Sequence, residues 1–177
     1  MRDTKETLIC PACGKEMKKV FIKSAGINLD ICLDGCGGIL FDNQELKHFD
    51  EIHEDISEIQ ELYEGKTFEK VDLTKKRTCP ICDSGMVRNH ASHMQEIEID
   101  ECYSCGAIFL DYGELKAIRN QFKTEEDRKE AFIKYFQNKH NAYGLDNYKL
   151  QDSNKYMRKQ YGFLISSIAN SIMRGLD

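Results

Sequence analysis

Residues 102–115 read CYSCGAIFLDYGEL, and residues 32–46 read CLDGCGGILFDNQEL. From the second cysteine of each stretch onward, the two align at an offset of 69 positions. A CPxC motif upstream, at Cys10, repeats at Cys79 with the same offset. This period is longer than the roughly 20–50 residues of solenoid repeats, so the sequence predicts two copies of a small domain. All eight cysteines of the chain lie in these two copies.

The cysteine spacing predicts one metal site in each copy. A CxxC turn places two sulfurs on one side of a tight loop, and two such turns supply four ligands for a tetrahedral Zn²⁺ ion. Four protein ligands leave no position for water, which predicts structural ions. A rubredoxin-like iron site and eight independent buried cysteines are the alternatives. The predicted ligands of the two ions are Cys10, Cys13, Cys32, Cys36, Cys79, Cys82, Cys102 and Cys105.

The residue after a CxxC turn often adopts a positive φ, which suits glycine. Gly14, Gly37 and Gly106 occupy three of these positions, and Asp83 occupies the fourth. The turn from Cys32 to Cys36 has one residue more than the others, and Gly35 is expected to let the loop absorb it.

Short apolar and alternating segments between and after the cysteines predict two or three short antiparallel strands in each copy. A copy of about forty residues is too small to fold on its own core, so metal binding should supply much of its folding energy. The predicted fold class is a small metal-stapled α+β protein: two tandem ribbons, each followed by a helix, and a C-terminal helical tail.

An aspartate and a glutamate three residues apart follow the last predicted strand of each copy. Asp42 precedes Glu45, and Asp111 precedes Glu114. The spacing and the apolar residues after it indicate a helix start with a reciprocal carboxylate, a variant of the capping box. A catalytic carboxylate pair is the other interpretation of these acids.

The pattern CPxCG, a central hairpin, and then CG-[GA]-[IV]-[FL]-[LF]-D-x-G-E-L resembles the transcription factor IIB-like zinc-ribbon family of small prokaryotic proteins. The resemblance covers residues 8–48 and 77–119. It implies zinc-bound ribbons with the eight cysteines as ligands, and the family name suggests transcription. The first copy departs from the pattern with CLDGC and with Gln44 in place of glycine, and the second departs with Asp83.

Between the copies, apolar residues recur at alternating spacings of three and four, which predicts one helix over residues 43–63. This stripe either packs against the helix after the second copy or forms a homodimer seam. Residues 65–78 read as a polar linker. The stripe consists of Phe49, Ile52, Ile56, Ile59 and Tyr63.

After the second copy, a helix is predicted from Tyr112 to about Gln121, and Thr124 opens a capping signal for another. A final amphipathic stripe is predicted to fold back on the protein, to bind a protein partner or a second copy, or to lie on a membrane surface. The candidate binding residues of this stripe are Met157, Tyr161, Leu164 and Ile168.

The net charge of −5 is uneven along the chain. Residues 49–78 and 79–119 each carry a net charge of −4, and residues 120–177 carry +3. Phosphate binding needs clustered Lys and Arg, and the candidates in the first hairpin are Lys15, Lys18, Lys19 and Lys23, against Arg88 alone in the second. The chain has neither an apolar run long enough to cross a membrane nor a signal-peptide core, which favours the cytoplasm.

These patterns predict four segments: residues 1–48, the first ribbon with the start of a helix; 49–78, an acidic helix and linker; 79–122, the second ribbon with its helix; and 123–177, the helical tail. The favoured function is a non-enzymatic zinc protein that acts as a protein-binding adaptor, in transcription or another nucleic-acid process. The alternatives are direct nucleic-acid binding by the hairpins and a rubredoxin-like iron or redox protein.

Overall fold

The computed structural model describes residues 6–42, 44–92, 96–124, 126–128, 130–131 and 133–135. The candidate binding residues Met157, Tyr161, Leu164 and Ile168 lie outside this range. In the described part, no helix is long and apolar enough to cross a membrane. The elements in chain order are β1 (Lys18–Ile22), β2 (Ile27–Ile31), β3 (Ile39–Phe41), a 3-10 helix η1 (Leu46–His48), α1 (Ser57–Tyr63), β4 (Val87–His90), β5 (Glu98–Glu101), β6 (Ile108–Leu110) and α2 (Glu114–Asn120).

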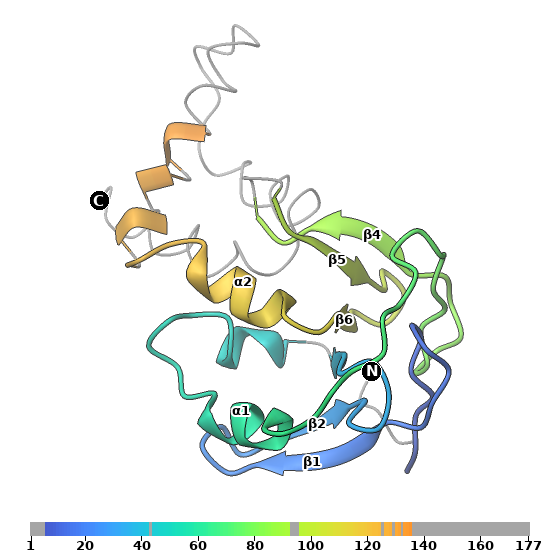
Figure 1. Cartoon of the computed structure of the whole chain (residues 1–177). Coiled ribbons are helices and arrows are strands. Elements are labelled where there is room, and N and C mark those ends of the chain that lie inside the picture. Colours follow the sequence, from blue (N-terminus) through green and yellow to red (C-terminus); the bar gives the residue numbers. More distant parts are fainter. Residues whose placement is uncertain are drawn as a thin grey trace, which may run out of the picture.

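Each copy contributes three antiparallel strands, within the predicted two or three, and the six strands form one sheet. The strand order is β1-β2-β3-β6-β5-β4, so the third strands of the two copies lie side by side at its centre. Figure 1 shows the two hairpins on opposite sides of this central pair, with the helices gathered together at one side of the sheet.

The central pairing of β3 with β6 relates the copies by an approximate twofold axis. Leu40 faces Phe109 across the two strands, and these residues are equivalent in the repeat because they are 69 positions apart. Each third strand would otherwise leave an edge of unpaired backbone N–H and C=O groups. The two copies therefore satisfy each other's edge through the same surface, as subunits of a twofold dimer do.

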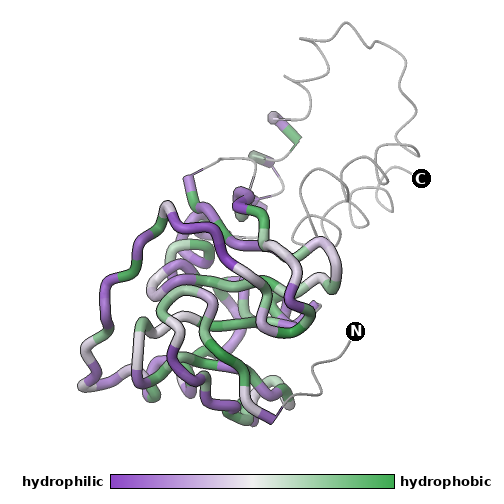
Figure 2. The backbone as a smooth tube through the Cα atoms, turned by 90° about the vertical axis from the view of Figure 1, so that its right-hand side faces the viewer, coloured by the Kyte–Doolittle hydropathy of each residue, from purple (hydrophilic) through white to green (hydrophobic). Residues whose placement is uncertain are grey.

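Alternate residues of the central strands point into two different cores. Ile39, Phe41, Ile108 and Leu110 lie in one core with residues of η1, α1 and α2. Leu40 and Phe109 lie in the other core, with the cysteines. Side chains of successive strand residues point to opposite faces, so the sheet has a helix face and a metal face. Figure 2 shows hydrophobic residues gathered mostly inside the molecule and hydrophilic residues along its outer loops.

The predicted single helix over residues 43–63 is wrong, because the chain forms η1, an irregular stretch, and then the short helix α1. Arg119 of α2 explains the irregular stretch. Its guanidinium donates to the backbone oxygens of Phe49 at 2.7 Å, Ile52 at 3.1 Å and Glu54 at 2.7 Å. These carbonyls are thereby satisfied by a side chain, where a helix would need them for its own backbone bonds.

The apolar stripe of this segment packs inside the molecule only in part. Phe49 and Ile59 are buried in the same core as Leu115 and Ile118 of α2, which agrees with packing against the partner helix. Ile52 is 53% exposed, so the stripe does not form one continuous helix face.

After the third strand of each copy, the reciprocal half of the predicted capping box is formed, in which the glutamate accepts a backbone hydrogen bond. The backbone N–H of Asp42 donates to Glu45 at 2.8 Å, and that of Asp111 donates to Glu114 at 2.7 Å. The helix N-cap in the second copy is Gly113 at φ +92°, with no side-chain cap bond. In both copies the glutamate thus fixes the entry to the helical segment.

The capping signal at Thr124 is confirmed. The Thr124 hydroxyl accepts from the backbone N–H of Asp127 at 3.0 Å, and the Asp127 carboxylate accepts from the backbone N–H of Thr124 at 3.1 Å. Residues 126–128, 130–131 and 133–135 are helical. Arg128 ties this helix to the segment before α1, with guanidinium nitrogens 3.5 Å from Asp50 and 2.7 Å from Glu51.

Candidate metal centres

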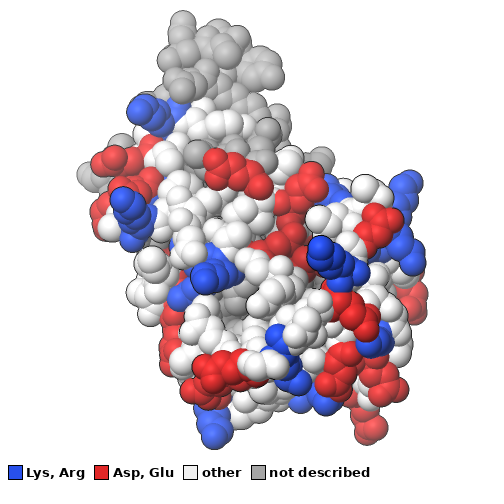
Figure 3. All heavy atoms as spheres, in the orientation of Figure 1, with Lys and Arg blue, Asp and Glu red and all other residues white. Residues whose placement is uncertain are grey.

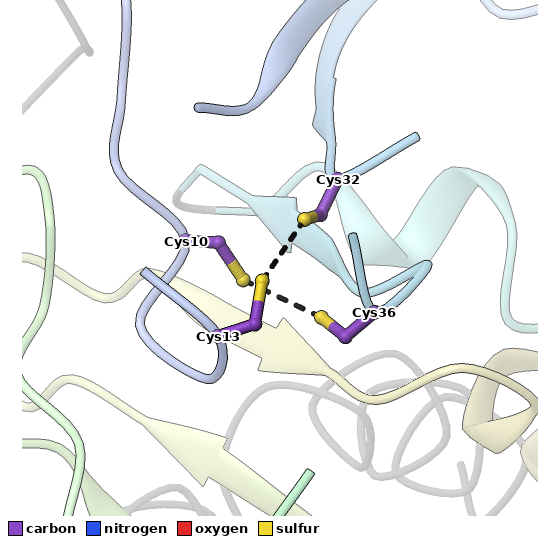
Figure 4. A group of neighbouring side chains, drawn as sticks. All are labelled: Cys10, Cys13, Cys32 and Cys36. Carbon is purple, nitrogen blue, oxygen red and sulfur yellow. Dashed lines mark hydrogen bonds between the residues drawn. The ribbon is translucent and has the colours of Figure 1, made fainter. Parts of the chain in front are cut away.

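The eight cysteines form two separate clusters of four, as their spacing predicts. In the first, the sulfurs of Cys10 and Cys36 are 3.5 Å apart and those of Cys13 and Cys32 are 3.4 Å apart. Figure 4 shows the four side chains pointing toward one another from two loops. In the second cluster, the corresponding distances are 3.6 Å for Cys79 to Cys105 and 3.4 Å for Cys82 to Cys102. None of the eight forms a disulfide.

The geometry of both clusters fits a tetrahedral ion. In each, the four ligand atoms lie within 4.8 Å of one another. Sulfurs bound to one Zn²⁺ at about 2.3 Å are separated by about 3.8 Å, close to the observed values. Three of the four cysteines in each cluster are buried, and Cys13 and Cys82 are partly exposed. Four cysteine ligands complete the coordination of an ion, so each site fits a structural zinc.

The three regular cysteine turns share the same backbone hydrogen bond. The amides of Gly14 and Asp83 donate to the carbonyl of the first cysteine of their turn at 2.9 Å, and Gly106 donates to Cys102 at 2.7 Å. Gly14 and Gly106 have φ of +79° and +82°, and Asp83 has φ +60°. Gly37 has φ +73°. The predicted left-handed positions after all four turns are therefore confirmed.

Gly35 accommodates the extra residue of its turn, for a reason that the sequence does not reveal. A Cβ atom there would lie 2.7 Å from the Cys32 sulfur and 2.8 Å from the Cys13 sulfur. Real Cβ contacts are longer, so the position requires glycine because the backbone passes directly against the sulfurs. The loop is shaped around the metal site.

Backbone N–H groups of the turns hydrogen bond to the thiolates. Burial raises the pKa of Cys79 to about 11, while the amides of Cys82 and Ile81 act in the opposite direction. The side chain and backbone amide of Ser84 lower the pKa of Cys82 to about 6. Such donors favour the thiolate, the form that binds a metal. The charge of four thiolates around one ion is thus partly offset by the protein backbone.

A family model described as Transcription factor zinc-finger, the transcription factor IIB-type zinc ribbon, matches residues 9–50 and 78–121. The chain carries two tandem zinc ribbons of this family. The boundaries agree with the repeat and with the strands, and residues 8–48 and 77–119 are called the first and second ribbon below. No curated protein and no solved structure matched the chain.

The lysines of the first hairpin are close to carboxylates. The Lys18 ammonium is 2.7 Å from Asp34, and Lys15 donates to the backbone oxygen of Asp34 at 2.9 Å and pairs with Glu69. Lys19 is 2.9 Å from the buried Asp30. These three ammonium groups already have anionic partners on the protein.

Lys23, the fourth lysine of the first hairpin, and Arg88 of the second hairpin also have carboxylates in their surroundings. The charge of Lys23 helps to lower the pKa of Glu58, after the larger effects of the Ser24 and Lys23 amides. Arg88 is 3.6 Å from Asp100. Figure 3 shows basic and acidic side chains interspersed over one face of the molecule, with no continuous basic patch on it. A nucleic-acid phosphate would compete with a carboxylate for Lys15, Lys18, Lys19 and Arg88.

Arg77 is the main buried residue that the sequence analysis missed. Its side chain is 1% exposed, and its guanidinium donates to Asp100 at 2.7 Å and to Asp111 at 2.8 Å. It also lies 5.0 Å from the centre of the Phe109 ring. The repeat contains a signal for it, because the equivalent residue in the first ribbon is the buried Leu8. A charged residue that replaces a buried leucine indicates an internal charge partner.

The polar linker of the sequence analysis also contains a half-buried aromatic residue. Phe68 packs on Tyr63 and Tyr112 with ring centres 5.1 and 4.6 Å away. The linker thus contacts both ribbons, through Tyr112 of the second and through residues beside the first metal site.

Proposed function

We propose that this protein is a non-enzymatic zinc protein that acts as a protein-binding adaptor in transcription or another nucleic-acid process. The observation that carries the proposal is the closure of both metal sites by four cysteines of the chain itself. A catalytic zinc keeps one coordination position for water or substrate, whereas the four cysteines of each site fill all four positions. The family description supports the transcription-related setting.

The charges of the described surface support a protein partner over a nucleic acid. Affinity for nucleic acid comes largely from Lys and Arg that neutralise phosphates. Three of the four candidate lysines of the first hairpin, Lys15, Lys18 and Lys19, pair with carboxylates, and residues 49–119 carry a net charge of −8 before the thiolates are counted. A partner with a basic or mixed surface suits this arrangement better than a phosphate backbone does.

Affinity capture tests the proposal. Tagged full-length protein would be captured from nuclease-treated and untreated lysate of its own cells, and the bound molecules identified. Recovery of the same protein partner after nuclease treatment would support the adaptor. Bound nucleic acid alone, lost on nuclease treatment, would overturn it in favour of the hairpins.

A truncated chain sharpens this experiment. Removal of residues 137–177 deletes the predicted amphipathic stripe and keeps Arg128 with its partners Asp50 and Glu51, which anchor the preceding helix. If the tail is the docking element, the truncated protein keeps its zinc and loses the partner. Unchanged capture would place the docking surface on the ribbons.

Direct nucleic-acid binding by the hairpins is the second candidate, because the matched family is one of transcription factor zinc fingers. Its contacts would be Lys15, Lys18, Lys19 and Lys23. The test is the salt dependence of binding to a labelled oligonucleotide, since phosphate contacts weaken steeply as salt rises. Affinity that is unchanged in the variant Lys18→Gln/Lys23→Gln would exclude Lys18 and Lys23 as phosphate contacts.

Zinc is proposed over iron at both sites. A colourless protein with two zinc ions per chain would agree with this. Strong visible absorbance, with iron as the main metal after expression in medium that contains both, would support the rubredoxin-like alternative.

A further inference from the structure

The segment that joins α1 to the second ribbon lies over the metal site of the first. The backbone N–H of Glu69 donates to the carbonyl of Gly35 at 3.0 Å, and Gly35 itself lies against two of the metal-site sulfurs. The Glu69 carboxylate pairs with Lys15, which also holds the carbonyl of Asp34 at 2.9 Å. The segment therefore binds the second cysteine turn of the first ribbon directly at Gly35 and, through Lys15, at Asp34.

Aromatic contacts fix the same turn from its other end. A Cβ at Gly37 would lie 2.8 Å from the ring of Phe68, so the ring covers the backbone directly beside Cys36. The Tyr63 hydroxyl donates to the carbonyl of Gly37 at 2.8 Å. Val71 packs on the core that contains the cysteines. Residues 66–71 are called the strap below.

The equivalent turn of the second ribbon is more open. Gly35 and Gly37 are buried in the first turn, whereas Ser104 is exposed and Gly106 is half-buried in the second. Tyr103 is 63% exposed, although the equivalent part of the first turn contains the buried Leu33. Tyr103 is held by a bond from Asn89 at 3.2 Å, a residue of the same ribbon.

We propose that the strap makes the two zinc sites unequal, so that the first ribbon retains its ion while the second exchanges its ion with the surroundings. An ion held by four thiolates leaves when its turn opens and a competing ligand enters. Opening the first turn requires the strap to release Gly35, Gly37 and Lys15. Opening the second turn breaks fewer of the contacts in the described part of the chain. Local opening has its own free energy, separate from that of global unfolding.

The consequence is a protein with one permanent and one exchangeable zinc. At limiting zinc the second ribbon would empty first, and the first ribbon would stay folded on its ion. This inference concerns the retention of the metal and does not depend on the identity of any partner.

Site-resolved chelation tests the proposal on the full-length, zinc-loaded chain. Zinc release to excess EDTA would be followed with a chromogenic zinc indicator, and samples taken over time would be alkylated with N-ethylmaleimide and analysed by mass spectrometry. We expect two phases of one zinc each, with Cys79, Cys82, Cys102 and Cys105 alkylated about tenfold or more faster than the cysteines of the first ribbon.

Two variants that remove contacts of the strap distinguish its local effect on the first metal site from an effect on overall stability. Phe68→Ala removes the ring from Gly37, and Lys15→Met removes the contacts to Glu69 and Asp34. Each is expected to speed release from the first ribbon by about tenfold and to leave the second within about twofold. Lys70→Ala, an exposed neighbour on the strap, is the control and should change neither phase.

The outcomes are distinct. Equal rates at the two sites of the wild-type protein, or faster release from the first, would overturn the proposal. So would strap variants that accelerate both sites equally, because that result would report loss of overall stability.

Discussion

The buried cation Arg77 offers a stringent test of how the second ribbon is held together. The repeat itself supplies the substitution, since Leu8 occupies the equivalent position in the first ribbon and is 1% exposed. Arg77→Leu keeps an apolar side chain over Phe109 and removes both bonds to Asp100 and Asp111. The two carboxylate side chains are 7% and 11% exposed, so water cannot replace the guanidinium without rearrangement.

The expected loss of folding stability depends on the charges that remain after the substitution. Removing one partner of a buried ion pair costs about 3–5 kcal/mol because the other charge is left uncompensated. Arg88 stays 3.6 Å from Asp100 and offsets part of this loss. Burial already raises the pKa of Asp100 against the pull of Arg77 and Arg88, so protonation limits the loss further. The expected destabilisation of Arg77→Leu is about 3 kcal/mol.

The assay is urea unfolding of the zinc-loaded protein, followed by circular dichroism, with two zinc ions per chain verified for each variant. Lys76→Leu, the exposed neighbour, is the control and should stay within about 0.5 kcal/mol of wild type. Arg77→Leu/Asp100→Asn/Asp111→Asn removes the stranded charges and should recover at least about 1 kcal/mol of the loss. A loss below about 1 kcal/mol for Arg77→Leu, or no recovery in the triple variant, would refute the reasoning.

Further substitutions test three local features. Gln44 has φ +73° at the position where the second ribbon has Gly113. Gln44→Gly should therefore stabilise the zinc-loaded protein by about 0.5–1 kcal/mol in thermal melts, and Gly113→Ala should destabilise it by about 1 kcal/mol. A loss of stability in Gln44→Gly would contradict this reasoning. Gly35→Ala should bind one zinc per chain instead of two when loaded with zinc and measured without a chelator, because the added methyl would meet two sulfurs, whereas Gly85→Ala has open space and should bind both. Burial raises the pKa of Glu114 from 4.5 to about 7, so its ionisation costs folding free energy as pH rises through this window. Glu114→Gln avoids this cost, so the gain in melting temperature of the variant over wild type should grow from about pH 5 to pH 7.5 and then level off; a pH-independent difference would count against the buried carboxylate.

Local patterns were sufficient for the metal ligands and the turns. Cysteine spacing indicates a four-sulfur site because each short turn presents two sulfurs on one side of a loop, and two such turns complete a tetrahedral set of ligands. The left-handed turn positions were identified because a positive φ is tolerated by few residue types. The helix over residues 43–63 was mispredicted because the apolar periodicity of this segment does not reveal Arg119. This residue of α2 donates hydrogen bonds to three backbone carbonyls of the segment.

By itself, the sequence determined that the chain has two copies of a four-cysteine ribbon with two or three short strands each, since spacing, periodicity and turn residues are properties of neighbours along the chain. Only the tertiary structure decided that Leu40 meets Phe109 at the centre of one sheet, that Arg77 lies between two aspartates, and that residues 66–71 cover one metal site. These arrangements depend on contacts between residues far apart in sequence, where burial and charge compensation fix the geometry. The repeat gives both ribbons the same ligands, and the contacts around them make the two sites different.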